Sequence, residues 1–185
     1  MENTDTATKT MWKVDPTHSE VQFKVKHLVI TTVTGYFKKF EGSVKSPGPR
    51  EFDGAEVEFT VNTDSIDTNV NDRDNHLRSE EFFSSQKYPK MQFREGKMKK
   101  TGDDKFVING KLTIREHTRP IELTAELGGI VKDGYGQTKA GFEINGKLKR
   151  KEYGLAWDQV TEAGSVVVGD EVRLQLNVQV ILQED

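Results

Sequence analysis

The residues of this sequence that are best suited to acid–base chemistry fall into two short segments. One reads Asp15-Pro-Thr-His18-Ser19 and the other reads Arg73-Asp-Asn-His76. Aspartate, histidine and serine are the groups of a hydrolytic triad, but working triads draw their members from separate elements. Because Asp15, His18 and Ser19 are nearly adjacent, we expect a turn that leads into a strand. The second segment pairs a guanidinium with an imidazole, which suits an anionic head group at the entrance of a binding site.

No motif for a metal or a cofactor accompanies these segments. The sequence has no cysteine, which removes thiolate zinc sites and disulfides. Its four histidines are not paired at HxH or HxxxH spacing. The stretch from Asp67 to Asn71 begins like a calcium loop, but Asp72 replaces the required glycine and Arg78 the bidentate glutamate. No glycine-rich phosphate loop is present either. We therefore expect neither a metal nor a cofactor.

Composition narrows the class of protein. Hydrophobic residues make up 34% and charged residues 31% of the 185 positions, and the net charge of −3 argues against a nucleic-acid partner. The apolar runs are too short for a transmembrane segment. Residues 1–10 lack the apolar stretch of a secretory signal, so we expect a disordered tail before a single domain over 11–183. The missing signal favours a cytoplasmic location, or a periplasmic one if the chain was trimmed.

The elements that position these groups are strands, because polar and apolar residues alternate with a period of two. In the last segment Val172, Leu174, Leu176, Val178 and Val180 alternate with polar residues, as in a strand with one dry face. Short turn signals separate the segments, which favours an antiparallel barrel that leaves no open edge. Residues 65–88 lack alternation, and we expect a short helix near 69–78. The predicted strands cover 12–14, 20–26, 36–44, 56–61, 91–98, 106–114, 121–127, 142–148 and 172–180.

Small residues on the dry faces bear on whether the barrel is hollow. Gly110, Ala125 and Gly146 occupy positions where a larger side chain would fill the interior. A barrel of about eight strands holds a small ligand only if such side chains are small. The same glycines also relieve bending strain in curled strands. The pattern alone therefore leaves a hollow interior and a packed one equally open.

Several motifs in order along the chain resemble those of the YceI-like family. The most specific begin with D-P-T-H-S (Asp15–Ser19) and R-D-N-H-L (Arg73–Leu77), and the resemblance runs over about residues 12–182. It implies an all-β fold, an eight-stranded antiparallel lipocalin-like barrel with a short helical insertion near 65–88. It also implies a long tunnel that binds a polyisoprenoid, a quinone precursor or another long-chain lipid, no catalytic residue set, and a homodimer.

Residues for such a tunnel are taken from the dry faces and from the two polar motifs. An apolar tube gains about 0.8 kcal/mol for each methylene it removes from water, and a few polar groups at the mouth give specificity. The mouth candidates are His18, Arg73 and His76. The tunnel candidates are Phe23, Val25, Phe37, Phe59, Phe93, Ile114, Leu123, Phe142, Leu174 and Leu176.

Two other functions remain open at this point. The first is an enzyme that acts on a prenyl or acyl substrate with His76 or His18 as its base, which the clustering of polar residues motivates. The second is a structural or stress-response protein whose barrel is packed solid. The inward faces of the strands distinguish these functions from a lipid carrier or scavenger: a carrier needs an apolar void between them, a structural protein has them packed together, and an enzyme needs a histidine at the void.

Overall fold

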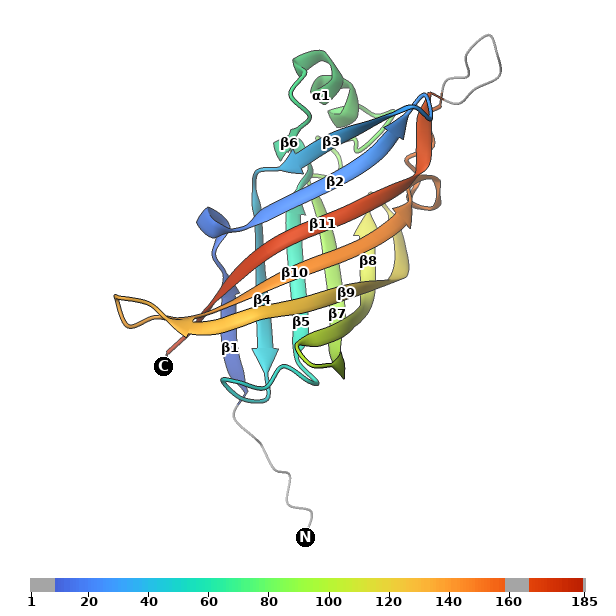
Figure 1. Cartoon of the computed structure of the whole chain (residues 1–185). Coiled ribbons are helices and arrows are strands. Elements are labelled where there is room, and N and C mark those ends of the chain that lie inside the picture. The colour runs from blue at the N-terminus through green and yellow to red at the C-terminus, as the bar shows by residue number, and fades with distance from the viewer. Residues whose placement is uncertain (1–8, 159–166, 185) are drawn as a thin grey trace.

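The computed structural model describes residues 9–158 and 167–184. Antiparallel strands make up most of this part of the chain (Figure 1). The helices are η1 (Pro16–His18), η2 (Thr63–Ser65), α1 (Asn71–Arg78) and η3 (Arg150–Tyr153). The strands are β1 (Thr10–Val14), β2 (Glu20–His27), β3 (Thr31–Phe37), β4 (Phe40–Ser46), β5 (Glu56–Asn62), β6 (Ile66–Asp67), β7 (Lys90–Gly102), β8 (Lys105–Ile114), β9 (His117–Lys132), β10 (Thr138–Lys149) and β11 (Val168–Leu182).

Eight of these strands close into a barrel, which confirms the predicted fold. The hydrogen-bonded order runs β1-β4-β5-β7-β8-β9-β10-β11, and β11 pairs with β1 to complete the ring. The first half of β11 pairs with β2 instead, and β3 and β6 extend the sheet from there. One end of the barrel is therefore a closed ring, and α1 lies at the other end (Figure 1).

Strand β11 shows how the alternating sequence produces the barrel wall. Its five apolar side chains face inward, as predicted, and the polar residues between them face outward. Val178 and Val180 are buried, whereas Val172, Leu174 and Leu176 are only half-buried on the same inward face. The change along one strand shows that the barrel interior is packed at one end and less filled at the other.

The predicted strand over residues 36–44 is wrong as a continuous element. The structure ends β3 at Phe37 and begins β4 at Phe40, and both phenylalanines contribute to the same core cluster. Side chains three positions apart cannot share a face in an unbroken strand. The backbone N–H of Lys38 donates to the carbonyl of Ser65, and the carbonyl of Lys39 accepts from the N–H of Asn62. The chain thus changes partners at this break, which alternation alone does not reveal.

The predicted helix is present as α1, and polar contacts hold it to the chain that follows β6. Its first turn carries Asp72 and Asp74 and its last turn His76 and Arg78, which matches the helix dipole. The carboxylate of buried Asp74 accepts hydrogen bonds from the backbone N–H (2.8 Å) and hydroxyl (2.5 Å) of Thr68. No helix among the described residues is long and apolar enough to cross a membrane. Most of the predicted tail, residues 1–10, lies outside the described residues.

Candidate ligand-binding cavity

An apolar cavity of about 180 Å³ occupies the half of the barrel that faces α1. One water needs about 10–15 Å³ of such space, so the cavity accommodates on the order of ten atoms of a slender ligand. Twenty-six described residues line it, and among them only Gln22 and Arg150 are polar. The side chains come from strands all around the barrel and from the helical segment above it. The sequence did not decide between a hollow and a packed interior, and this half of the barrel is hollow.

The other half of the barrel is packed solid. Trp12 and Phe52 are fully buried there, with ring centroids 5.3 Å apart, and the ring of Phe142 meets Phe52 edge-on at 5.0 Å. Phe52 belongs to the long connection between β4 and β5, so this loop folds over the end of the ring. The interior is thus divided into a packed lower half, which we call the floor, and a hollow upper half. The alternative of a barrel that is packed solid therefore holds for one end only.

The structure brings nine of the ten predicted tunnel residues together around the cavity. Phe142 is not among the lining residues, because it belongs to the packed cluster with Trp12 and Phe52. Alternation identified the inward face of its strand but not the depth at which packing begins. Five further lining residues, from the α1 segment and from η3 and the chain after it, were not among the predicted tunnel residues. These are Leu77, Phe82, Phe83, Arg150 and Leu155.

The inward glycines have a role beyond the two that were considered from the sequence. A methyl group on Gly35 would lie 2.2 Å from Cζ of Phe23, and one on Gly110 would lie 2.4 Å from Cζ of Phe93. Neither glycine has a positive φ. Their lack of a side chain therefore accommodates the tips of large rings against the barrel wall. The ring of Phe23 or Phe93 occupies the space next to each of these glycines. Because the two rings lie close to the wall, they leave the middle of the cavity open.

The segment containing α1 covers the hollow end. Leu77 on the helix and Phe82 and Phe83 after it line the cavity from above. The ring of Phe83 meets that of Phe37 edge-on, with centroids 5.7 Å apart. These side chains form an apolar cover over the cavity, which we call the α1 cover (Leu77, Phe82 and Phe83).

Arg150 borders the cavity but uses its polar atoms elsewhere. Its guanidinium is 3% exposed and donates to four carbonyl groups at 2.7–3.1 Å, those of Leu155, Trp157, Val168 and Gly169. Burial lowers the pKa of Arg150, while the charges of Asp158 and Asp170 oppose that shift. Arg150 therefore ties the chain after β10 to the start of β11.

Two of the predicted mouth residues lie on α1, beside the cavity without lining it. Arg73 turns back to Thr68, where Nε donates to the hydroxyl at 2.7 Å and Nη2 to the carbonyl at 2.6 Å. His76 pairs through Nε2 with Glu81, and its ring packs edge-on against Phe82 and Trp157 at 5.1 and 4.8 Å. His76 therefore connects the α1 cover to the chain held by Arg150.

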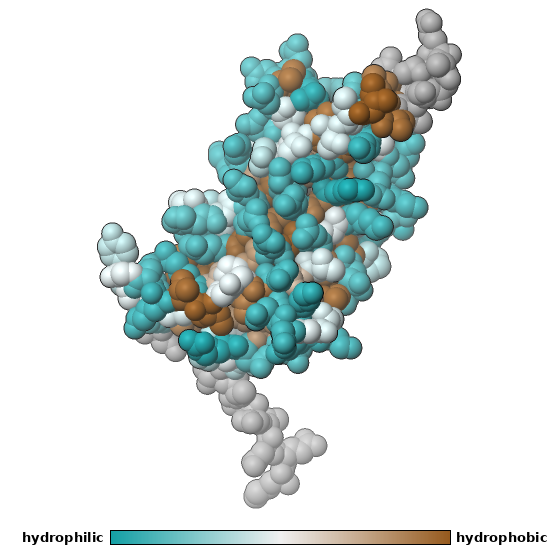
Figure 2. Space-filling view, viewed as in Figure 1, coloured by the Kyte–Doolittle hydropathy of each residue, from teal (hydrophilic) through white to brown (hydrophobic). Residues whose placement is uncertain are grey.

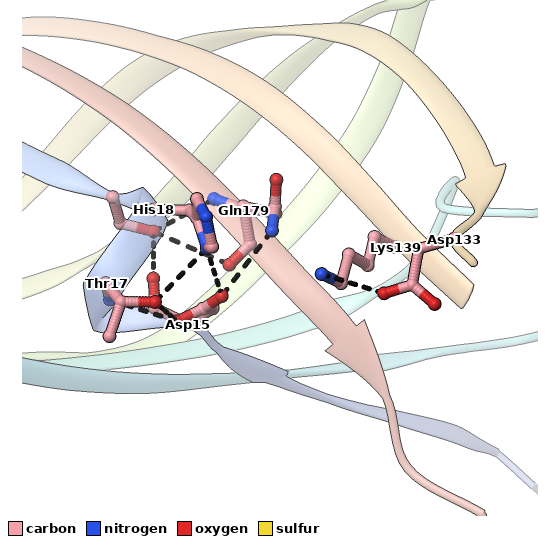
Figure 3. Close-up of polar contacts among 7 residues, drawn as sticks. Asp15, Thr17, His18, Asp133, Lys139 and Gln179 are labelled. Carbon is pink, nitrogen blue, oxygen red and sulfur yellow. Dashed lines mark hydrogen bonds and ion pairs between the residues drawn. The ribbon is translucent and has the colours of Figure 1, made fainter. Parts of the chain in front are cut away.

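The third predicted mouth residue, His18, lies on the outer wall beside β11 (Figure 3). Its Nδ1 is 2.7 Å from Oδ2 of Asp15, whose other oxygen accepts from the hydroxyl (2.6 Å) and backbone N–H (2.9 Å) of Thr17. The Thr17 hydroxyl, followed by His18 and the Thr17 amide, lowers the pKa of Asp15 to about 2 although burial opposes the shift. The predicted turn is present, and its side chains do not line the cavity.

Comparison with known proteins identifies the family and the fold. A family model described as the YceI-like domain matches residues 12–180. The chain belongs to the YceI-like family. Protein YceI of Salmonella newport is 37% identical over 161 residues, which cover 84% of this chain and 81% of that protein. The resemblance inferred from the D-P-T-H-S and R-D-N-H-L motifs is therefore confirmed.

Solved structures show the same fold. The YceI protein of Campylobacter jejuni superposes with a TM-score of 0.71 at 32% identity and covers 86% of this chain and 90% of its own. A polyisoprenoid binding domain from Saccharophagus degradans superposes with a TM-score of 0.64 at 13% identity, over 93% of this chain and 98% of its own. At that identity the second similarity concerns the fold.

Proposed function

We propose that this YceI-like protein binds the apolar tail of a long-chain amphiphilic lipid inside its barrel and carries or scavenges that lipid. The observation that supports this proposal is the cavity of about 180 Å³, lined by apolar side chains and placed under the α1 cover. The fold shared with a polyisoprenoid binding domain favours a polyisoprenoid, a quinone precursor or a fatty-acid derivative as the ligand.

The energetics of such binding follow from the lining. Each methylene moved from water to an apolar wall contributes about 0.8 kcal/mol, so about ten carbons in contact with the lining contribute about 8 kcal/mol, which corresponds to micromolar affinity. The packed floor at Phe142 blocks the far end, so the tail enters from the α1 end and the polar head stays there. Specificity for the head then depends on the residues around the α1 cover.

The positions of the polar residues favour binding over catalysis. Neither His18 nor His76, the two candidate bases, lines the cavity. The donors of Arg150 are committed to backbone carbonyls. A general base needs to be within hydrogen-bond reach of the proton that it abstracts. The cavity offers a bound chain mainly dispersion contacts and exclusion from water.

A pair of neighbouring substitutions tests the proposal. Leu174 faces the cavity, and Gln175 is the next residue on β11 and is exposed on the outer face. Leu174→Trp fills space that two or three methylenes would occupy, so a fluorescent long-chain fatty acid should bind about 2 kcal/mol, or roughly thirty-fold, more weakly. Gln175→Trp adds the same side chain outside and should leave affinity unchanged.

Native mass spectrometry of the purified protein provides the complementary measurement. We expect a co-purifying amphiphile on the wild-type chain and less of it on Leu174→Trp. Protein that is repeatedly empty, together with equal binding by the two tryptophan variants, would refute the carrier role. If the bound lipid were instead converted to product, and His76→Ala abolished that conversion, an enzyme would be established.

A further inference from the structure

A cluster of exposed aliphatic side chains lies at the tip of the hairpin between β2 and β3. Val29 is 72% and Ile30 79% exposed, among the most exposed large hydrophobic residues that the structure describes. In Figure 2 hydrophobic residues gather at this tip, at the upper end of the barrel. We call Val29 and Ile30 the hairpin tip. Nothing in the described structure packs over them.

The backbone conformation of this turn is unfavourable for the aliphatic residues that occupy it. The N–H of Ile30 donates to the carbonyl of His27, and both central residues have positive φ, 52° for Leu28 and 65° for Val29. Such a turn favours asparagine and glycine, and a β-branched valine there is strained. The hairpin thus carries aliphatic side chains where polar or glycine residues would fold more easily and be better solvated. Strain that persists at an exposed site is typical of a functional position.

The strands that carry the hairpin tip are basic on their outer face. Strand β2 carries Lys24 and Lys26 near the hairpin tip, and its one acid, Glu20, is at the far end of the strand; β3 has no aspartate or glutamate, although the whole chain has a net charge of −3. In the strand register Lys147 stands opposite Arg173, and Arg173 stands opposite Lys24. Like charges placed opposite one another destabilise a sheet. Glu171 lies 3.5 Å from Arg173 in the same strand, and among the described residues neither Lys24 nor Lys147 forms an ion pair.

The hairpin tip also lies at the hollow end of the barrel. Val25 and Val168 line the cavity, and Val168 pairs with His27 at the base of the turn. At about 3.3 Å per residue, Lys26 is within about 10 Å of Val29 along the strand. The headgroup layer of one leaflet is about 5–8 Å deep, and the long side chain of Lys26 spans the remaining distance. An apolar tip flanked by cations at that distance matches the boundary between acyl chains and anionic headgroups.

We infer that the hairpin tip is a membrane-docking element that inserts into an anionic lipid surface, with Lys26 contacting the headgroups and Lys24, Lys147 and Arg173 attracting that surface from further along the strands. Docking in this way places the hollow end of the barrel against the bilayer. A lipid tail then passes between bilayer and cavity with little exposure to water. This last step depends on the proposed function, whereas the docking itself does not depend on what the cavity holds.

Vesicle sedimentation tests the docking. Wild-type protein should sediment with vesicles of phosphatidylglycerol and phosphatidylcholine, and much less with phosphatidylcholine alone or at high salt. Val29→Gly/Ile30→Thr should bind at least about ten-fold more weakly and should fold normally, because glycine suits the φ of 65° at Val29. Lys24→Gln/Lys26→Gln should remove the preference for anionic vesicles. The matched control is Val131→Thr/Tyr135→Ser, which removes exposed side chains (62% and 94%) near the turn between β9 and β10 and should bind like the wild type.

The outcomes separate docking from cavity binding. Leu174→Trp should bind the fatty-acid probe more weakly but still sediment with anionic vesicles, and Val29→Gly/Ile30→Thr should bind the probe like the wild type in vesicle-free solution. Equal sedimentation of wild type and Val29→Gly/Ile30→Thr would overturn the inference. So would a change from dimer to monomer in Val29→Gly/Ile30→Thr with vesicle binding unchanged, because the hairpin tip would then be an interface between two copies of this chain.

Discussion

Single polar side chains stabilise the packed end of the barrel. The indole Nε1 of Trp12 donates to the hydroxyl of Ser46 at 2.9 Å, and that hydroxyl donates to the carbonyl of Gly48 at 2.7 Å. Trp12 and Ser46 are both fully buried. A buried donor without an acceptor costs more than the net value of the hydrogen bond. The hydroxyl of Ser46 is therefore needed for a large aromatic residue to lie in this core.

Ser46→Ala should lower the free energy of unfolding by about 1–3 kcal/mol, because the indole N–H loses its acceptor. Urea denaturation followed by tryptophan fluorescence measures the change. Ser43→Ala, on the opposite face of the same strand, is the control and should change stability by less than about 0.5 kcal/mol. Equal effects of the two substitutions would contradict the role given to the Ser46 hydroxyl.

Asp15 makes a pH-dependent contribution to stability. Its pKa is lowered from 3.8 to about 2, mainly by the hydroxyl of Thr17. A carboxylate with a lowered pKa in the folded state stabilises the protein above its ordinary pKa and loses that effect as the pH falls toward the lowered value. The contribution of Asp15 is therefore complete above about pH 4 and disappears between about pH 4 and pH 2.

Replacing Asp15 by asparagine should remove this dependence. Between about pH 5 and pH 2.5, the free energy of unfolding in urea should fall further for the wild type than for Asp15→Asn. Comparing the two proteins cancels the contributions of the other carboxylates. Parallel pH profiles would show that the contacts of Thr17 and His18 do not stabilise the ionised form.

At the scale of elements, contacts between strands set the width of the cavity. The ring of Phe93 on β7 lies against Gly110 on β8, where an added methyl would also come within 3.0 Å of the carbonyl oxygen of Arg94. A residue larger than glycine at this position forces the ring toward the barrel axis. The glycines of the wall therefore determine the space left for a ligand.

Gly110→Ala should destabilise the protein by about 1–3 kcal/mol through overpacking and should weaken binding of the fatty-acid probe. The matched control is Gly141→Ala on β10, where an added methyl meets nothing within 4 Å. We expect the control to be neutral or slightly stabilising, because alanine restricts the unfolded chain. Thermal unfolding and probe titration measure both effects, and equal affinity in Gly110→Ala and wild type would contradict the arrangement of Phe93.

Several elements could be predicted from the sequence, and the limits have physical causes. Alternation located β11 and most of the barrel strands because each has one dry face, and the loss of alternation over residues 65–88 indicated α1. The break between Phe37 and Phe40 was missed because it reflects a change of pairing partner, which depends on distant strands. Nine tunnel residues were found because they face inward, but the placement of Phe142 depends on the loop that brings Phe52 over the ring.

For the whole molecule, the division into a packed end and a hollow end predicts uneven local stability. Amides near Val178 and Val180 lie in the densely packed half, whereas those near Val172 and Leu174 border the cavity. Local opening is easiest where few apolar contacts hold the backbone. We expect hydrogen exchange to be at least about ten-fold slower at Val178 than at Leu174 in ligand-free protein. A bound ligand should reduce this difference in exchange rate. Equal exchange rates along β11 in ligand-free protein would contradict the prediction.

The packed floor beneath the cavity also limits the length of tail that the barrel can hold. In a series of saturated tails of increasing length, affinity should rise in even steps while each added carbon still finds wall to touch. Once the terminal methyl reaches the ring of Phe142, further carbons have to bend back or stay outside in water. The affinity should then level off at one chain length, and that length is set by how far Phe52 and its loop push the aromatic floor up the barrel.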